Sequence, residues 1–140
     1  MKRRLVSSAI AVVWLVGSVP SVIGQADPVA LFRQFVEART RGDVAGAVSV
    51  FTDDAMYRGG ACRPCVGKAA IRAEIERRVA QRIATAIIAS KVSDNVAQVR
   101  VVFTTAEMRT AHQKPEIAIA TVELRGDKIS SLRFTLVSDH

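Results

Sequence analysis

The sequence is poor in aromatic residues, proline, histidine and cysteine. Aromatic side chains make up 5% of its 140 residues, which is too few for the base-stacking surface of a single-strand nucleic-acid binder. Only 4 Pro and 8 Gly exclude a collagen-like or low-complexity chain. The hydrophobic fraction of 49% therefore predicts one folded domain with its own core. Basic residues outnumber acidic ones, for a net charge of +7, but after residue 4 they are spread along the chain, so we expect no nucleic-acid partner.

One long uncharged segment, residues 5–24, lies at the N-terminus. Basic residues 2–4 precede it, and an apolar centre, a proline and small residues near its end complete the order of a bacterial signal peptide. The alternative is an uncleaved anchor, because a segment of this length can just cross a bilayer. We expect a signal peptide at residues 1–24, one domain at residues 25–140, secretion or a periplasmic location, and no membrane contact after cleavage.

Helical spacing dominates the front of the domain. Asp27 and Pro28 are typical of a helix start, and apolar residues recur at helical spacing until Gly42. Asp43 is placed to cap a second, shorter helix. An apolar residue at every fourth position predicts a third helix from residue 68 to about residue 83.

Extended structure dominates the back of the domain. We expect a turn at residues 52–54, a short strand at 55–58 and a loop at 59–67. Segments rich in β-branched residues predict four longer strands, at residues 86–92, 96–109, 116–125 and 128–137. Short turns between them favour an antiparallel meander. The predicted fold class is α+β, with three N-terminal helices packed on an antiparallel sheet of about four long strands plus one short strand.

The order of motifs resembles a known family. Residues 35–60 read FVEARTRGDVAGAVSVFTDDAMYRGG, with a Gly-Asp between the first two helices and Phe-x-Asp-Asp-Ala before the first strand. Residues 66–75, VGKAAIRAEI, carry a Gly-Lys that opens the third helix. This order is similar to that of the SnoaL-like branch of the nuclear transport factor two superfamily. The resemblance implies a cone-shaped domain in which a curved sheet wraps a long helix, with a largely apolar pocket at the open end.

The resemblance also implies the residues that meet a small hydrophobic ligand in that pocket: Phe35, Tyr57, Gly59, Phe103 and Glu107. Strand parity places Tyr57 and Gly59 on one face of the short strand, and Arg58 on the other. A Tyr57 phenol in an apolar pocket can orient a ligand with one hydrogen bond. The alternative is a core tyrosine whose hydroxyl is satisfied locally.

One reaction known in this family requires catalytic side chains that this sequence does not have. Ketosteroid isomerases of the superfamily use a tyrosine on the first helix, a general-base aspartate and a second acid. These positions fall on Phe35, on Gly59, and on Ala120 or its neighbour Ile119. None of these side chains can abstract a proton or hold an oxyanion, so we expect no steroid isomerisation. Cyclases of the family place their acid elsewhere, and Glu107 is the candidate.

Other polar residues lie near the predicted strand 96–109. Glu107 and Arg109 are two apart, and on one strand they share a face, forming either a polar pocket mouth or a solvated pair at the rim. His112 lies between two strands and His140 ends the chain. We expect both histidines to be exposed rather than to form a catalytic pair.

The 2 cysteines, Cys62 and Cys65, leave two readings open. Their Cys-x-Pro-Cys order is typical of thioredoxin-like oxidoreductases, although no βαβ unit precedes it. In an exported protein the same spacing favours a structural disulfide that closes a small loop. A zinc site would need two more ligands, and we predict neither a metal nor a cofactor.

The sequence therefore predicts an exported SnoaL-like protein whose apolar pocket binds a small hydrophobic molecule, with catalysis undecided. The alternatives are a thiol-disulfide oxidoreductase using Cys62 and Cys65, and a cyclase- or isomerase-like enzyme acting through Tyr57 and Glu107. A homodimer is left open.

Overall fold

The computed structural model describes residues 26–137. The expected signal peptide at residues 1–24 and the terminal His140 lie outside the described residues. Within them, every helix is too short or too polar to cross a membrane.

Local sequence explains where the helices begin and end. The Asp27 carboxylate accepts a hydrogen bond from the Val29 backbone N–H at 2.9 Å, which caps the first helix, and the Asp43 carboxylate caps the second in the same way. The third helix ends earlier than expected, because Arg82 adopts a positive φ of 52° that no helix accommodates. The helices are α1 (Pro28–Thr40), α2 (Val44–Val48), α3 (Lys68–Ala80) and α4 (Ala106–Thr110).

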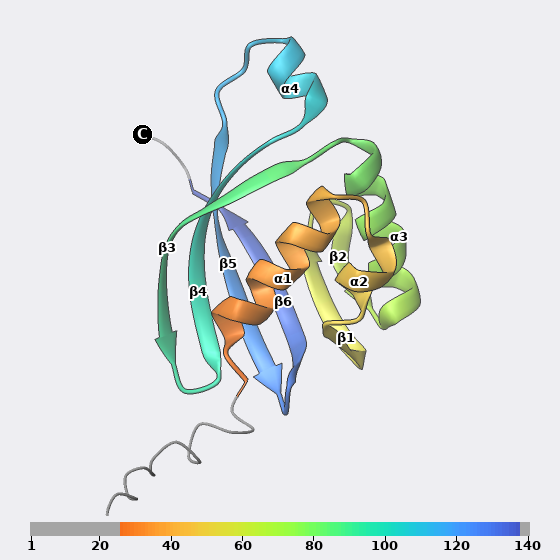
Figure 1. The fold of residues 1–140 in the computed structure, drawn as a ribbon, viewed down its shortest axis with the longest axis vertical. Coiled ribbons are helices and arrows are strands. Elements are labelled where there is room, and N and C mark those ends of the chain that lie inside the picture. The colour runs from red at the N-terminus through yellow and green to blue at the C-terminus, as the bar shows by residue number, and fades with distance from the viewer. Residues whose placement is uncertain (1–25, 138–140) are drawn as a thin grey trace, which may run out of the picture.

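The strands form one six-stranded sheet in the order β2-β1-β6-β5-β4-β3 (Figure 1). They are β1 (Phe51–Gly59), β2 (Cys62–Val66), β3 (Ala84–Ser93), β4 (Val96–Thr104), β5 (Glu116–Arg125) and β6 (Lys128–Leu136). The predicted meander of β3 to β6 is confirmed. The sheet is mixed rather than purely antiparallel, because β1 pairs parallel to β6.

Three expected boundaries are wrong, and each has a structural reason. The predicted turn at residues 52–54 belongs to β1, because Phe51 is buried in the core and pairs with Ile129 of β6. The second half of the predicted loop 59–67 is β2, which pairs antiparallel with β1. The predicted strand 96–109 ends at Thr104, because the Thr105 hydroxyl accepts a hydrogen bond from the Met108 backbone N–H and starts α4.

Helix α1 packs across one face of the sheet, and α2 and α3 lie beyond its β1 and β2 edge (Figure 1). An aromatic cluster joins helix and sheet: the Phe35 ring centroid lies 5.5 Å from that of Phe51 and 6.4 Å from that of Tyr57. At the end of the sheet where β4 leads into β5, the connection between these strands carries α4 away from the core (Figure 1). Residues of α1, α4 and the sheet line a common cavity at this end.

Candidate functional site

A cavity of about 620 Å³ opens at that end of the molecule. Side chains from α1, α3 and α4 and from strands β1, β3, β4, β5 and β6 line it. Its volume falls in the range of roughly 300 to 1,000 Å³ that is usual for small-molecule sites. Because the lining comes from elements far apart in the sequence, the site exists only in the folded chain.

Four of the five residues expected at the pocket line this cavity: Tyr57, Gly59, Phe103 and Glu107. Phe35 is fully buried and is not among the lining residues; its ring packs in the aromatic cluster with Phe51 and Tyr57. Ala120 is also fully buried, and Ala118, two residues before it on the same face of β5, reaches the cavity instead.

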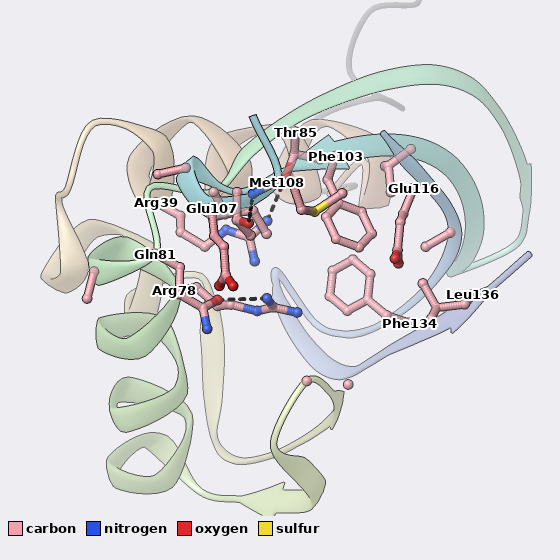
Figure 2. Close-up of a pocket in the computed structure, with 18 of the residues that line it drawn as sticks. Arg39, Arg78, Gln81, Thr85, Phe103, Glu107, Met108, Glu116, Phe134 and Leu136 are labelled. Carbon is pink, nitrogen blue, oxygen red and sulfur yellow. Dashed lines mark hydrogen bonds between the residues drawn. The ribbon is translucent and has the colours of Figure 1, made fainter. Parts of the chain in front are cut away.

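One wall of the cavity is apolar. Phe103, Phe134 and Leu136 line this wall (Figure 2). Gly59 has a φ of +142°, and a Cβ there would lie 3.2 Å from Phe134, so glycine allows the ring to pack against the strand. This wall can hold the hydrophobic body of a ligand.

The opposite wall carries Arg39, a residue that sequence analysis did not single out. Its side chain is 3% exposed, its Nη2 donates to Thr85 Oγ1 at 3.0 Å, and its guanidinium lies 4.8 Å from the centre of the Phe35 ring. The Nε has no hydrogen-bond partner among the described residues. Burial lowers the pKa of Arg39, but an arginine keeps its charge in a protein. A buried cation therefore forms part of the cavity.

Arg78 of α3 lies on the same wall. Its Nη1 donates to Gln81 Oε1 at 2.9 Å, and its Nε lies 3.4 Å from Glu74 Oε2 without forming a hydrogen bond. That carboxylate is already engaged by Arg77, at 2.8 Å to the same oxygen. The proximity of Arg78 contributes to the lowered pKa of Arg39, after the larger effect of burial.

Tyr57 lies beside Arg39 and is 2% exposed. Burial raises the pKa of its phenol, and the neighbouring Arg39 opposes that shift. The phenol is therefore neutral near pH 7, and its hydroxyl can donate a hydrogen bond. Strand parity correctly predicted that Tyr57 points inward and that Arg58 is exposed.

The expected pairing of Glu107 and Arg109 on one strand face is wrong, because both residues lie in α4. Residues two apart on a helix do not share a face. Glu107 lines the cavity at its exposed mouth, whereas Arg109 donates to Thr104 Oγ1 at 2.7 Å and to the Arg82 carbonyl at 2.9 Å. Arg109 therefore attaches α4 to the connection between α3 and β3.

The expected disulfide between Cys62 and Cys65 is formed, with the two Cα atoms 4.8 Å apart. Both cysteines lie in the edge strand β2, and neither lines the cavity. His112 is exposed and also lies away from the cavity. Within residues 26–137, no group of three metal-ligating side chains is close enough to hold an ion.

The chain belongs to the SnoaL-like domain family, whose profile matches residues 32–132. No curated protein sequence matches it. Among solved structures, it is similar to an NTF2-like protein of unknown function from Cytophaga hutchinsonii, with 13% identity over 81% of this chain and 92% of the other, and a TM-score of 0.65.

Two further solved structures share the fold and carry names that suggest activities. One is a candidate polyketide cyclase from Sinorhizobium meliloti, with 17% identity over 76% of this chain and 94% of the other, and a TM-score of 0.65. The other is a candidate ketosteroid isomerase from Kribbella flavida, with 12% identity over 79% of this chain and 78% of the other, and a TM-score of 0.64. These identities establish a common NTF2-like fold rather than a common reaction.

Proposed function

We propose that this protein binds a small, mostly hydrophobic molecule in the cavity between α1, α4 and the sheet. The observation that carries the proposal is a cavity of about 620 Å³ with an apolar wall built from Phe103, Phe134 and Leu136. Burial of a ligand's apolar surface on this wall supplies the main driving force for binding. The order of residues 1–24 supports export, so the ligand is met outside the cytoplasm.

A fluorescence titration with N-phenyl-1-naphthylamine, an uncharged dye that brightens in apolar sites, tests this proposal. We expect saturable binding to the wild-type protein. Ala118→Phe should weaken it, because Ala118 is fully buried at the cavity wall and a phenyl ring there fills the space. The control is Ala86→Phe, an exposed position on β3 outside the cavity. Equal binding by both variants would place the dye elsewhere.

A second candidate is acid–base catalysis on a bound ketone, because Tyr57 and Glu107 line the same cavity. In this reaction the Glu107 carboxylate takes a proton from the carbon next to the carbonyl, and the Tyr57 hydroxyl donates to the developing enolate oxygen. Deuterium exchange into 2-decanone in heavy water, followed by NMR, tests it. Exchange that is lost in Glu107→Gln and retained in Glu116→Gln, its neighbour at the cavity, would establish the reaction.

The geometry does not favour thiol-disulfide exchange. Cys62 is 4% exposed, and the disulfide lies within β2 rather than at the start of α3, which begins at Lys68. Catalytic cysteines of thioredoxin-like proteins sit at a helix N-terminus with an accessible sulfur. We therefore propose a structural role for this disulfide, which links the first and fourth residues of the edge strand β2.

A further inference from the structure

The polar wall of the cavity carries more positive charge than its protein partners neutralise. Glu74, the carboxylate nearest to the two cavity arginines, forms a bidentate pair with Arg77 and lies 3.4 Å from the Nε of Arg78. Arg39 forms no ion pair with any described residue. Glu74 thus pairs with Arg77 and Arg78, and Arg39 has no carboxylate partner among the described residues.

The arginines also have unused donors. Within the described part of the chain, Arg78 donates one side-chain hydrogen bond, to Gln81, whereas Arg39 donates to Thr85 and also interacts with the Tyr57 hydroxyl. A guanidinium presents a planar fork of several N–H donors that matches the two oxygens of a carboxylate. The Nε atoms of both residues are buried without a hydrogen-bond partner in residues 26–137.

The neighbouring cavity residues do not supply that partner. Glu107 and Glu116 line the cavity but are exposed at its mouth, and neither forms an ion pair with Arg39 or Arg78. The Tyr57 hydroxyl can accept a hydrogen bond from Arg39, but it is neutral and does not balance the positive charge. Figure 2 shows Arg39 and Arg78 on one side of the cavity and Phe103 and Phe134 on the other.

We propose that the ligand is an amphipathic carboxylic acid, whose carboxylate is bound by Arg39 and Arg78 while its hydrocarbon body lies against Phe103 and Phe134. This inference rests on the proposed binding function and specifies its ligand class. A carboxylate supplies the missing negative charge, and charge-assisted hydrogen bonds to it are stronger than neutral ones. A neutral ligand of the same shape leaves the arginines unpaired.

The test compares decanoate with 1-decanol, which share a chain length and differ in the head group. Each displaces N-phenyl-1-naphthylamine from the purified protein, at concentrations below the micellar range of decanoate. We expect decanoate to bind roughly 10- to 100-fold more tightly than 1-decanol, as charge-assisted hydrogen bonds predict. Arg39→Met and Arg78→Met should each reduce this preference, with decanoate and 1-decanol both measured against the dye affinity of the same variant. Arg133→Met, at an exposed position on β6, is the matched control for overall charge.

The outcomes separate this inference from the proposal beneath it. If the dye binds and decanoate is no better than 1-decanol, the ligand class is wrong and the hydrophobic site stands. If neither the dye, decanol nor decanoate binds, both fail. If Arg133→Met reduces the decanoate preference as much as Arg39→Met does, the preference comes from general surface charge and the inference is overturned. If Arg39→Met or Arg78→Met does not fold, the relative affinity of the wild-type protein for decanoate and 1-decanol decides whether the ligand is a carboxylate.

Discussion

Arg39 lies one helical turn after Phe35, and its guanidinium carbon sits 4.8 Å from the centre of the Phe35 ring. The Phe35 ring thus packs against the buried guanidinium group that lines the cavity. The sequence analysis predicted Phe35 as a lining residue, which is one helical turn before Arg39, the residue of α1 that does line the cavity. The residue that meets the cavity is its neighbour on the same helix face.

We predict that Arg39→Met leaves the free energy of unfolding unchanged or raises it by about 1 kcal/mol. The substitution removes a buried charge that no carboxylate in the described residues pairs with, and methionine fills similar space. Chemical denaturation measures the effect. Phe35→Ala is the contrasting variant, with an expected loss of about 3 to 5 kcal/mol. A large loss in Arg39→Met would show that the arginine is mainly structural.

The turn after β1 should tolerate no side chain at Gly60. Its φ is +56°, and a Cβ there would lie 2.3 Å from Glu74 Oε2 and 2.6 Å from Arg77 Nη2. We predict that Gly60→Ala destabilises the protein by about 2 to 3 kcal/mol, through backbone strain and displacement of this ion pair.

Gly126→Ala is a close control for Gly60→Ala. Gly126 has a similar φ of +66°, and a Cβ there meets nothing within 4 Å. Gly126→Ala should lower the free energy of unfolding by only about 1 kcal/mol, which is the cost of placing alanine in a left-handed backbone conformation. Equal losses in thermal or chemical unfolding of the two variants would mean that Gly60 is needed for its backbone alone.

The disulfide should contribute little stability and no catalysis. Its cysteines are three residues apart in sequence, and closing so short a loop restricts the unfolded chain by at most about 2 kcal/mol. We predict a loss within that limit for the double variant Cys62→Ser, Cys65→Ser, and no insulin reduction by the wild-type protein. Insulin turnover that disappears in Cys62→Ser would support the redox alternative instead.

The pH dependence of one surface pair follows from its geometry. Arg125 donates to Asp54, and this hydrogen bond is the largest cause of the lowered pKa of the Asp54 carboxyl. A lowered carboxyl pKa means that the stabilising effect is present above the unfolded-state pKa and is lost as pH falls through the folded-state value. NMR titration should show the pKa of Asp54 rising in Arg125→Gln. Both groups are exposed, so high salt should reduce the difference.

The parts of the fold that were predicted correctly depend on local pattern. Strand β5 was predicted with its observed bounds, because its β-branched residues lie between clear turn signals. The start of β1 was missed because two exposed aspartates, Asp53 and Asp54, resemble a turn when their neighbours in space are unknown. The parallel pairing of β1 with β6 joins residues far apart in the chain, and no local pattern encodes it.

The site was predicted in part for the same reason. Strand parity and family resemblance placed Tyr57 and Gly59 at the cavity, but the pocket was expected to be largely apolar. A signal for its charge was present: Phe32, Phe35 and Arg39 share one helix face, so an arginine continues an apolar stripe. Whether such an arginine is buried or reaches solvent depends on which residues pack over it. Here Thr85 of β3 packs over Arg39 and accepts its hydrogen bond.

The location of a bound ligand decides whether this cavity is the binding site. Backbone amide shifts on titration with N-phenyl-1-naphthylamine should cluster around the cavity, at Tyr57, Phe103 and Phe134. A smaller groove lies elsewhere on the sheet, lined by residues that include Ser90, Gln98 and Ile119, and it serves as the internal comparison. Saturable shifts confined to the cavity are the predicted result, and shifts that centre on the groove, or no saturable shifts at all, would contradict it.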